Sequence, residues 1–262
     1  MSIDTSADLR GSMIRDGFAA LPGLLGLAHL QQLRAAVGEL QARAGTLTAS
    51  SDDFVLEAAG IGGWAAWQQD QPPLAGVLRS ASRIHQHVTA FDDIQQSLGL
   101  AEGPVAAVAG TPGRLVNAFL WAKPPLVGSE KPWHQDMAFA PTGFDLDTSS
   151  VLTVWIAVEP ATTRNGCLQF IPGSHRKGLL PHVGDPERGP GQPAAQQAVE
   201  PHVELEGTAV QDQALSLPLA PGSAVLFDGM VLHRSAPNLT ASEPRTAVSF
   251  VYQVPRPAWT RA

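Results

Sequence analysis

The chain has 262 residues, of which 44% are hydrophobic and 16% charged, a composition typical of a folded globular protein rather than a disordered one. Its formal net charge of −7 argues against nucleic acid as a partner, because nucleic-acid-binding domains are usually basic. The sequence contains no run of about 18 uncharged apolar residues, so it predicts no membrane span.

Two features of the sequence bear on its compartment. Residues 1–10 lack the apolar stretch of a secretory signal. Cys167 is the single cysteine, which excludes an intramolecular disulfide and suits a reducing environment. We therefore expect a cytoplasmic protein; the sequence leaves its oligomeric state open.

The N-terminal part, about residues 1–100, is predicted to be mainly helical. A helix should end near Gly17, since glycine is common just past a helix end, and a short strand should follow at 18–21. Apolar residues recur at three- and four-residue steps from Leu27 to Leu40, which predicts a helix over 27–44. We expect a loop with one strand at 45–62 and a mostly helical segment at 74–98.

The part from about 105 to 255 is predicted to be the β core. Short apolar runs alternate with proline- and glycine-rich turns, a pattern typical of a sandwich or barrel. Residues 178–202 form the longest stretch without predicted structure, and loops of this kind are often functional lids. We expect one domain over residues 1–262, with strands at 105–108, 115–121, 151–158, 167–171, 215–219, 224–227 and 245 to about 254.

A histidine and an aspartate two residues apart form the first candidate site. Residues i and i+2 of a strand face the same side, so one strand can direct His134 and Asp136 at one point. A metal there needs a third ligand, and His233, which follows another apolar run, is the best candidate. Two histidines and one carboxylate with the other positions open are the ligand set of non-haem Fe(II) oxygenases. The H-x-D triplet alone is weak evidence.

Other charged and imidazole side chains have different expected roles. Arg245 opens the last predicted strand, and its planar guanidinium suits the distal carboxylate of a 2-oxo acid. His175 follows a Pro-Gly-Ser turn and is expected to be structural. His182 and His202 lie in the long loop and are expected to be solvated.

Several short motifs, taken in chain order, resemble those of the phytanoyl-CoA dioxygenase family. The resemblance covers about residues 10–255, nearly the whole chain, and rests on six motifs in one order. They are Trp133-His134-Gln135-Asp136, Val154-Trp155-Ile156-Ala157-Val158-Glu159, Asn165-Gly166-Cys167-Leu168, Pro172-Gly173-Ser174-His175-Arg176, Leu232-His233-Arg234-Ser235 and Arg245.

The resemblance implies a fold and roles for individual residues. The implied fold is mainly β with flanking helices, built on a double-stranded β-helix. His134, Asp136 and His233 match the iron ligands, and Arg245 matches the arginine that pairs with the far carboxylate of 2-oxoglutarate. Further positions match the cosubstrate pocket, namely Ser235, Trp155, Phe119 and, with less support, Asn117. Gln135 should face away from the metal, and Lys123-Pro124-Pro125 resembles a segment that precedes the metal motif.

The resemblance also implies cofactors and a reaction. Fe(II), 2-oxoglutarate and O2 would together oxidise an unactivated C–H bond of a small molecule, with release of succinate and CO2. A carboxylate at Asp136, where related halogenases have a small residue, implies hydroxylation, desaturation, ring closure or epoxidation. Two alternatives stay open: a non-oxygenating member that binds metal or metabolite, and a cupin-type metal enzyme that uses no 2-oxo acid.

The substrate is expected to be a free small molecule rather than an acyl-coenzyme A. Residues 178–215 contain six acidic residues and one basic residue, Arg188, which would repel a polyphosphate. We expect a natural-product intermediate or an amino-acid derivative.

Overall fold

The computed structural model describes residues 5–58, 72–140, 144–183, 202–205 and 208–257. Its helices are α1 (Thr5–Asp16), α2 (Leu27–Ala44), α4 (Ile84–His87), α5 (Ala90–Ser97) and α6 (Ala106–Ala109), and a π-helical turn at Ala101–Val105 leads into α6. The strands are β1 (Phe18–Leu21), β2 (Phe54–Ala58), β3 (Pro73–Ser82), β4 (Arg114–Lys123), β5 (Lys131–His134), β6 (Ser149–Ala157), β7 (Leu168–Phe170), β8 (Leu215–Leu217), β9 (Ala224–Asp228), β10 (His233–Ser235) and β11 (Arg245–Pro255).

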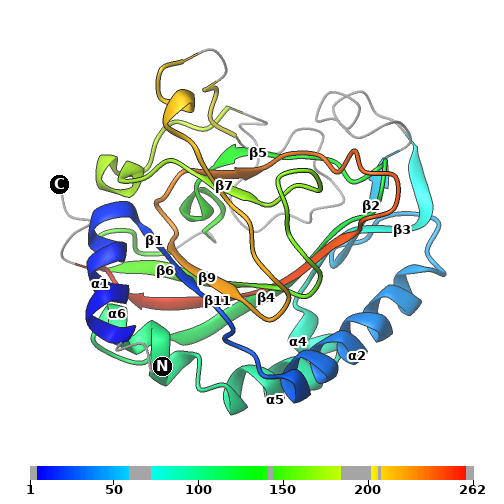
Figure 1. Ribbon diagram of the computed structural model, residues 1–262, viewed down its shortest axis with the longest axis horizontal. Coiled ribbons are helices and arrows are strands. Elements are labelled where there is room, and N and C mark those ends of the chain that lie inside the picture. The colour runs from blue at the N-terminus through cyan, green and yellow to red at the C-terminus, as the bar shows by residue number, and fades with distance from the viewer. Residues whose placement is uncertain (1–4, 59–71, 141–143, 184–201, 206–207, 258–262) are drawn as a thin grey trace.

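Two antiparallel sheets face each other. The larger has seven strands in the order β1-β9-β6-β11-β4-β3-β2, and the smaller has four in the order β5-β10-β7-β8 (Figure 1). From β4 to β11 the strands alternate between the two sheets, except that β7 and β8 both belong to the smaller sheet, as expected for a double-stranded β-helix. The N-terminal hundred residues contribute β1, β2 and β3 to the large sheet as well as helices.

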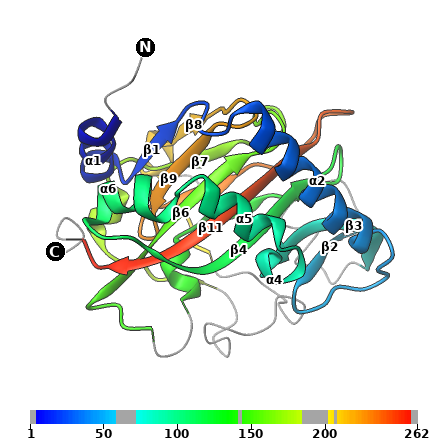
Figure 2. The same ribbon diagram turned by 90° about the horizontal axis from the view of Figure 1, so that it is seen from below.

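Helices cover the outer face of the large sheet. Figure 2 shows α2 and α5 lying across its strands. Leu33 and Leu40 of α2 pack with Leu120 of β4 and Phe250 of β11 in one buried cluster. Alternate residues of a strand face opposite sides, so the intervening residues of the same strands face the smaller sheet. Within the described residues, no helix is both long and apolar enough to cross a membrane.

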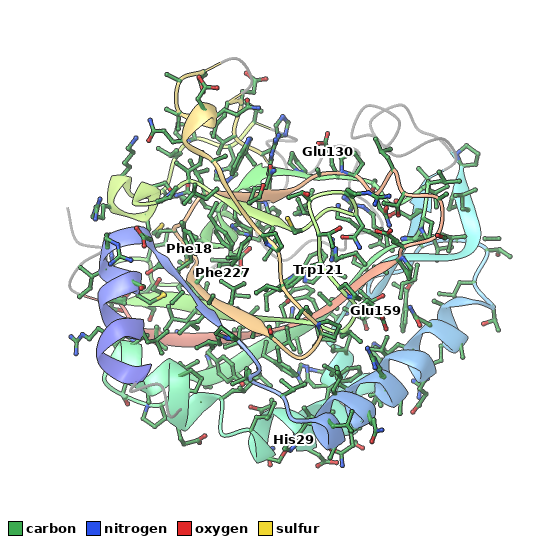
Figure 3. All side chains as sticks on the ribbon, in the orientation of Figure 1. Phe18, His29, Trp121, Glu130, Glu159 and Phe227 are labelled. Atoms are coloured by element: carbon green, nitrogen blue, oxygen red, sulfur yellow. The ribbon has the colours of Figure 1, made fainter. Side chains whose placement is uncertain are left out.

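The space between the sheets holds a second cluster and the polar residues described below. Trp155, Phe170, Phe227 and Ala247 are buried there. In Figure 3, Trp121 and Phe227 lie between the two sheets, whereas His29 lies on the outer helix α2. The large sheet therefore has an apolar helix-facing side and a mixed inner side that can carry a site.

Most predicted elements agree with the structure, and two do not. Helix α1 ends at Asp16, and Gly17 takes a φ of +84° as a helix-terminating glycine does. Residues 74–98 were expected to be mostly helical, but residues 74–82 belong to strand β3, because β2 and β4 provide backbone partners on both sides. Residues 105–108 were expected to be a strand but belong to the π-helical turn and α6.

Candidate metal centre and cosubstrate pocket

Two adjacent strands of the small sheet and a following turn bring three predicted ligands together. His134 ends β5 and His233 begins β10, and they are Cα partners in the antiparallel pairing. Asp136 starts a 3-10 turn, but Gln135 is still extended, with φ −121° and ψ 131°, so His134 and Asp136 face the same way. The Asp136 Oδ1 atom lies 3.6 Å from His134 Nε2 and 3.5 Å from His233 Nε2. The ligand atoms all lie within 4.8 Å of one another, as one bound metal ion requires.

Hydrogen bonds orient each of the three ligands. His134 Nδ1 lies 2.8 Å from the Pro132 carbonyl oxygen, and His233 Nδ1 lies 3.1 Å from that of Val231. When each Nδ1–H donates to its carbonyl, each Nε2 keeps a lone pair for a metal. The Thr153 hydroxyl donates to Asp136 Oδ2 at 2.8 Å, which leaves Oδ1 facing the imidazoles.

The electrostatics keep all three groups in their ligating forms. Burial, and then the nearby His233, lowers the pKa of His134 to about 3, and burial lowers the pKa of His233. Both imidazoles are therefore neutral at neutral pH. Burial opposes ionisation of Asp136, but the two imidazoles and the Thr153 hydroxyl hold the pKa of its carboxyl below the usual value. Neutral imidazole and ionised carboxylate are the forms that bind metal.

Gln135 faces away from the metal site, as predicted. Its side chain is fully buried, and its amide group donates to the carbonyls of Gly178 and Met230 at 2.9 and 2.6 Å. Its side-chain oxygen accepts the Leu180 N–H at 2.7 Å. Gln135 thus links three backbone segments and has a structural role.

Arg245 lies at the start of β11 with 3% of its surface exposed. Its Nη1 lies 3.4 Å from the Trp121 carbonyl, its guanidinium carbon is 5.6 Å from the centre of the Trp155 ring, and its Nε has no hydrogen-bond partner among the described residues. No described carboxylate lies within 4.0 Å of it. Burial lowers the pKa of Arg245 to about 9, so it remains cationic at neutral pH. A buried cation without an acidic partner fits the carboxylate of a bound ligand.

One cavity of about 660 Å³ contains the triad, Arg245 and the other predicted pocket residues. Ser235 lies on β10 and Trp155 on β6, and both are buried. Phe119 of β4 stacks on Trp121, with ring centres 5.3 Å apart. Asn117 also lines the cavity, but its side-chain oxygen accepts the backbone N–H groups of Arg83 and Ala118. The structure thus places every predicted site residue on the wall of the same cavity.

Sequence reasoning missed a buried cluster of charges beside Arg245. Glu57 is fully buried on β2 and accepts the Ser129 N–H at 3.0 Å, and Arg79 Nε donates to the Ser129 hydroxyl at 2.7 Å. Lys123 Nζ donates to the carbonyls of Ser129 and Ser235. Burial raises the pKa of Glu57 and lowers that of Lys123. The sequence signal for this cluster was Glu57, which directly follows the apolar run Phe54-Val55-Leu56.

The remaining histidines do not join the triad. His87 pairs with Asp53 at 2.8 Å, and His202 forms an isolated backbone bridge with Val183. His175 is fully buried and packs closely against Gly17. A Cβ atom added at Gly17 would lie 2.5 Å from the His175 ring. The expectation of a solvated side chain was wrong for His182, because Nε2 of this half-buried residue accepts the Gln135 N–H at 3.1 Å.

The buried His175 predicts a pH dependence of stability. Burial lowers its pKa from 6.5 to about 4. As pH falls from 6.5 towards 4, the unfolded chain binds a proton that the folded chain does not, so the free energy of unfolding decreases. The melting temperature of the metal-free protein is measured at roughly pH 7.5 and pH 5. Between these two values it should fall less in His175→Gln than in the original chain. An equal loss in both proteins would exclude this contribution.

Comparison with known proteins identifies the family of this chain. A family model described as "Phytanoyl-CoA dioxygenase (PhyH)" matches residues 13–247. The chain belongs to this family. "Phytanoyl-CoA dioxygenase domain-containing protein 1" of Rattus norvegicus is 30% identical over 181 residues, 68% of this chain and 58% of the relative. "Phytanoyl-CoA dioxygenase" of Arabidopsis thaliana is 36% identical over 129 residues, 48% of this chain and 40% of the relative. This PhyH-family chain spans about half the length of the curated relatives it matches.

Solved structures share the fold. EvdO2 from Micromonospora carbonacea var. aurantiaca, complexed with 2-oxoglutarate, has a TM-score of 0.68 and 25% identity over 98% of this PhyH-family chain and 93% of its own. EctD from S. alaskensis with bound Fe has a TM-score of 0.67 over 97% of this chain and 79% of its own; at 23% identity it shows the fold alone. The predicted double-stranded β-helix and the predicted family are confirmed.

Proposed function

We propose that this chain uses Fe(II), 2-oxoglutarate and O2 to oxidise an unactivated C–H bond of a free small molecule. The observation that carries the proposal is the shared cavity, which contains a two-histidine, one-carboxylate cluster and, separately, a buried arginine that lacks a described acidic partner. The first group suits iron with open coordination positions. The second suits the far carboxylate of a 2-oxo acid.

Each of these residues has a defined task. His134, Asp136 and His233 hold the iron, which supplies oxidative chemistry when it is bound with 2-oxoglutarate and O2. Arg245 and the Ser235 hydroxyl bind the far carboxylate. Trp155 lies against the Arg245 guanidinium and limits its movement. Binding at one fixed end orients the 2-oxo acid group towards the metal.

The state of Asp136 bears on the type of reaction. Its Oδ2 is engaged by Thr153, so one carboxylate oxygen remains for the metal. The family resemblance implies that Asp136 would be a metal ligand where related halogenases have a small residue. We therefore propose hydroxylation or a related oxidation, such as desaturation, ring closure or epoxidation.

The acidic composition of residues 178–215, known from the sequence alone, favours a free substrate over an acyl-coenzyme A. Residues 178–215 carry six acidic residues and one basic residue, which disfavour a polyphosphate. Two arginines of the cavity wall are already engaged: Arg83 pairs with Asp53, and Arg79 donates to Ser129 and to the Glu130 carbonyl. A natural-product intermediate or an amino-acid derivative fits these charges better.

Succinate formation tests both parts of the proposal. Purified protein supplied with Fe(II), O2 and 2-oxoglutarate should form succinate, and the correct substrate class should stimulate it. The panel is acyl-coenzyme A esters, amino acids and polycyclic or terpenoid metabolites, with mass spectrometry of the oxidised product. Coupled stimulation by acyl-coenzyme A esters alone would contradict the substrate proposal.

The same assay separates the two alternatives. Metal binding without any succinate would favour a non-oxygenating member of the fold. Turnover of a substrate without consumption of 2-oxoglutarate would favour a cupin-type enzyme that needs no 2-oxo acid. Arg245 and Ser235 argue against the cupin-type enzyme, because a buried cation is costly unless a ligand pairs with it.

A further inference from the structure

The strand that carries the first metal ligand lies at the edge of its sheet. Among the described strands, β5 pairs with β10 and with no other. Backbone groups of residues i and i+2 point to the same edge, so the Trp133 carbonyl and the Gln135 N–H share the outer edge. The Val203 N–H donates to the Trp133 carbonyl at 2.7 Å. The His182 imidazole accepts the Gln135 N–H at 3.1 Å and so replaces the carbonyl of a neighbouring strand.

The N–H bound by His182 belongs to the peptide that joins His134 to Gln135. Residues on both sides of Gln135 are metal ligands, so the orientation of this peptide sets where the two ligand side chains point. β10 holds His134 from the inner side through the His134–His233 pairing. His182 holds the next peptide from the outer side. The ligand pair is therefore fixed from both edges of β5.

His182 is itself held in place by the strap, which we define as residues 178–183. Its Nδ1 lies 2.9 Å from the Leu180 carbonyl, and donation there leaves Nε2 free to accept. The Leu180 N–H donates to Gln135 Oε1, and Gln135 Nε2 donates to the Gly178 carbonyl. Burial lowers the pKa of His182, which keeps the imidazole neutral at neutral pH. The strap and Gln135 are thus joined by three hydrogen bonds, two through the Gln135 side chain and one to its backbone N–H. A fourth hydrogen bond, within the strap, orients His182.

We propose that His182 is a positioning residue for the iron site. By accepting the Gln135 N–H it fixes the orientation of Asp136 relative to His134. It does not touch metal or cosubstrate, and it acts through the backbone between two ligands. The inference rests on the proposed function, because it takes His134, Asp136 and His233 as iron ligands.

Two substitutions separate the hydrogen bond from mere packing. His182→Leu fills the space but cannot accept a hydrogen bond. His182→Gln keeps a side-chain oxygen at the reach of Nε2. Each protein is titrated anaerobically with Co(II) as a spectroscopic stand-in for iron, and then with Fe(II) in the presence of 2-oxoglutarate. The melting temperature of each metal-free protein is measured in parallel.

We expect His182→Leu to bind both metals roughly 10- to 100-fold more weakly and to change the ligand-field spectrum of bound Co(II), as outer hydrogen-bond partners of ligands do. His182→Gln should recover most of the affinity and the original spectrum. Unchanged affinity and spectrum in His182→Leu would overturn the inference. If His182→Leu does not fold, His182→Asn replaces it, because the asparagine side chain is too short to reach the Gln135 N–H. Metal binding by His182→Asn as tight as that of the original chain would also overturn the inference.

The outcome is distinguishable from failure of the proposed function. If the original chain binds neither Co(II) nor Fe(II), the iron site itself is wrong. If it binds them and the His182 variants bind equally well, the site stands and His182 has no positioning role.

Discussion

Asp136→Ala or His233→Ala is expected to lower succinate formation by orders of magnitude while the chain still folds. Each change removes one of three ligand atoms that lie within 4.8 Å of one another, and two remaining ligands hold iron poorly. The fold should survive because burial keeps the imidazoles neutral, so loss of the carboxylate leaves no unpaired buried cation. Iron content, turnover and melting temperature of each variant check this.

The matched control is Asp93→Ala, which removes an exposed carboxylate from the outer helix α5. It should retain iron and turnover. Full activity in Asp136→Ala or His233→Ala, with unchanged iron stoichiometry, would rule out the three-ligand site.

Arg245→Ala should weaken 2-oxoglutarate binding by about 2–4 kcal/mol, the range for breaking a buried, hydrogen-bonded charge pair. The guanidinium is buried with no described carboxylate within 4.0 Å, so the cosubstrate would supply its anionic partner. Arg245→Lys should recover only part of the loss, because an ammonium cannot form the planar two-point contact. Anaerobic calorimetry with 2-oxoglutarate and the Michaelis constant both report the change.

Arg164→Ala provides the control for Arg245, since Arg164 is an exposed arginine paired with Glu243. It should leave 2-oxoglutarate binding unchanged. A Michaelis constant for 2-oxoglutarate that does not change in Arg245→Ala would contradict the assignment of the far carboxylate site.

Local sequence patterns predicted the C-terminal half of the fold better than the N-terminal half. The strands from Leu115 onwards are β-rich runs separated by proline and glycine, so local preference and tertiary structure agree. In β3, Leu74, Leu78 and Ala81 recur at three- and four-residue steps and imitate a helix, yet pairing with β2 and β4 determines the outcome. Residues 105–108 were predicted to be a strand but are helical, because a short apolar run does not distinguish a strand from a helix.

The clustering of His134, Asp136 and His233 was predictable because the spacing of the first two residues carries the geometry. Two residues apart on an extended chain is enough to place His134 beside Asp136, and His233 follows from the need for a third ligand. Glu57, Arg79 and Lys123 were not predictable as a group, since they come from three strands that meet only in the folded sheet. His182 was missed because its partner is a backbone N–H, which no side-chain pattern reveals.

Under the proposed function, the rigid large sheet fixes the separation between Arg245 and the metal site and so sets the length of the cosubstrate. Val251 lies six residues beyond Arg245 on this strand and is opposite Thr153, the residue that holds Asp136. Between Arg245 and Val251, β11 pairs with β4 without a register shift, and β6 flanks most of this stretch, so the separation cannot stretch. A diacid one methylene longer or shorter would have to buckle or leave one end unpaired. Under the proposed function, we expect such a mismatch to weaken binding by about 1–3 kcal/mol, so that the site selects a five-carbon 2-oxo diacid.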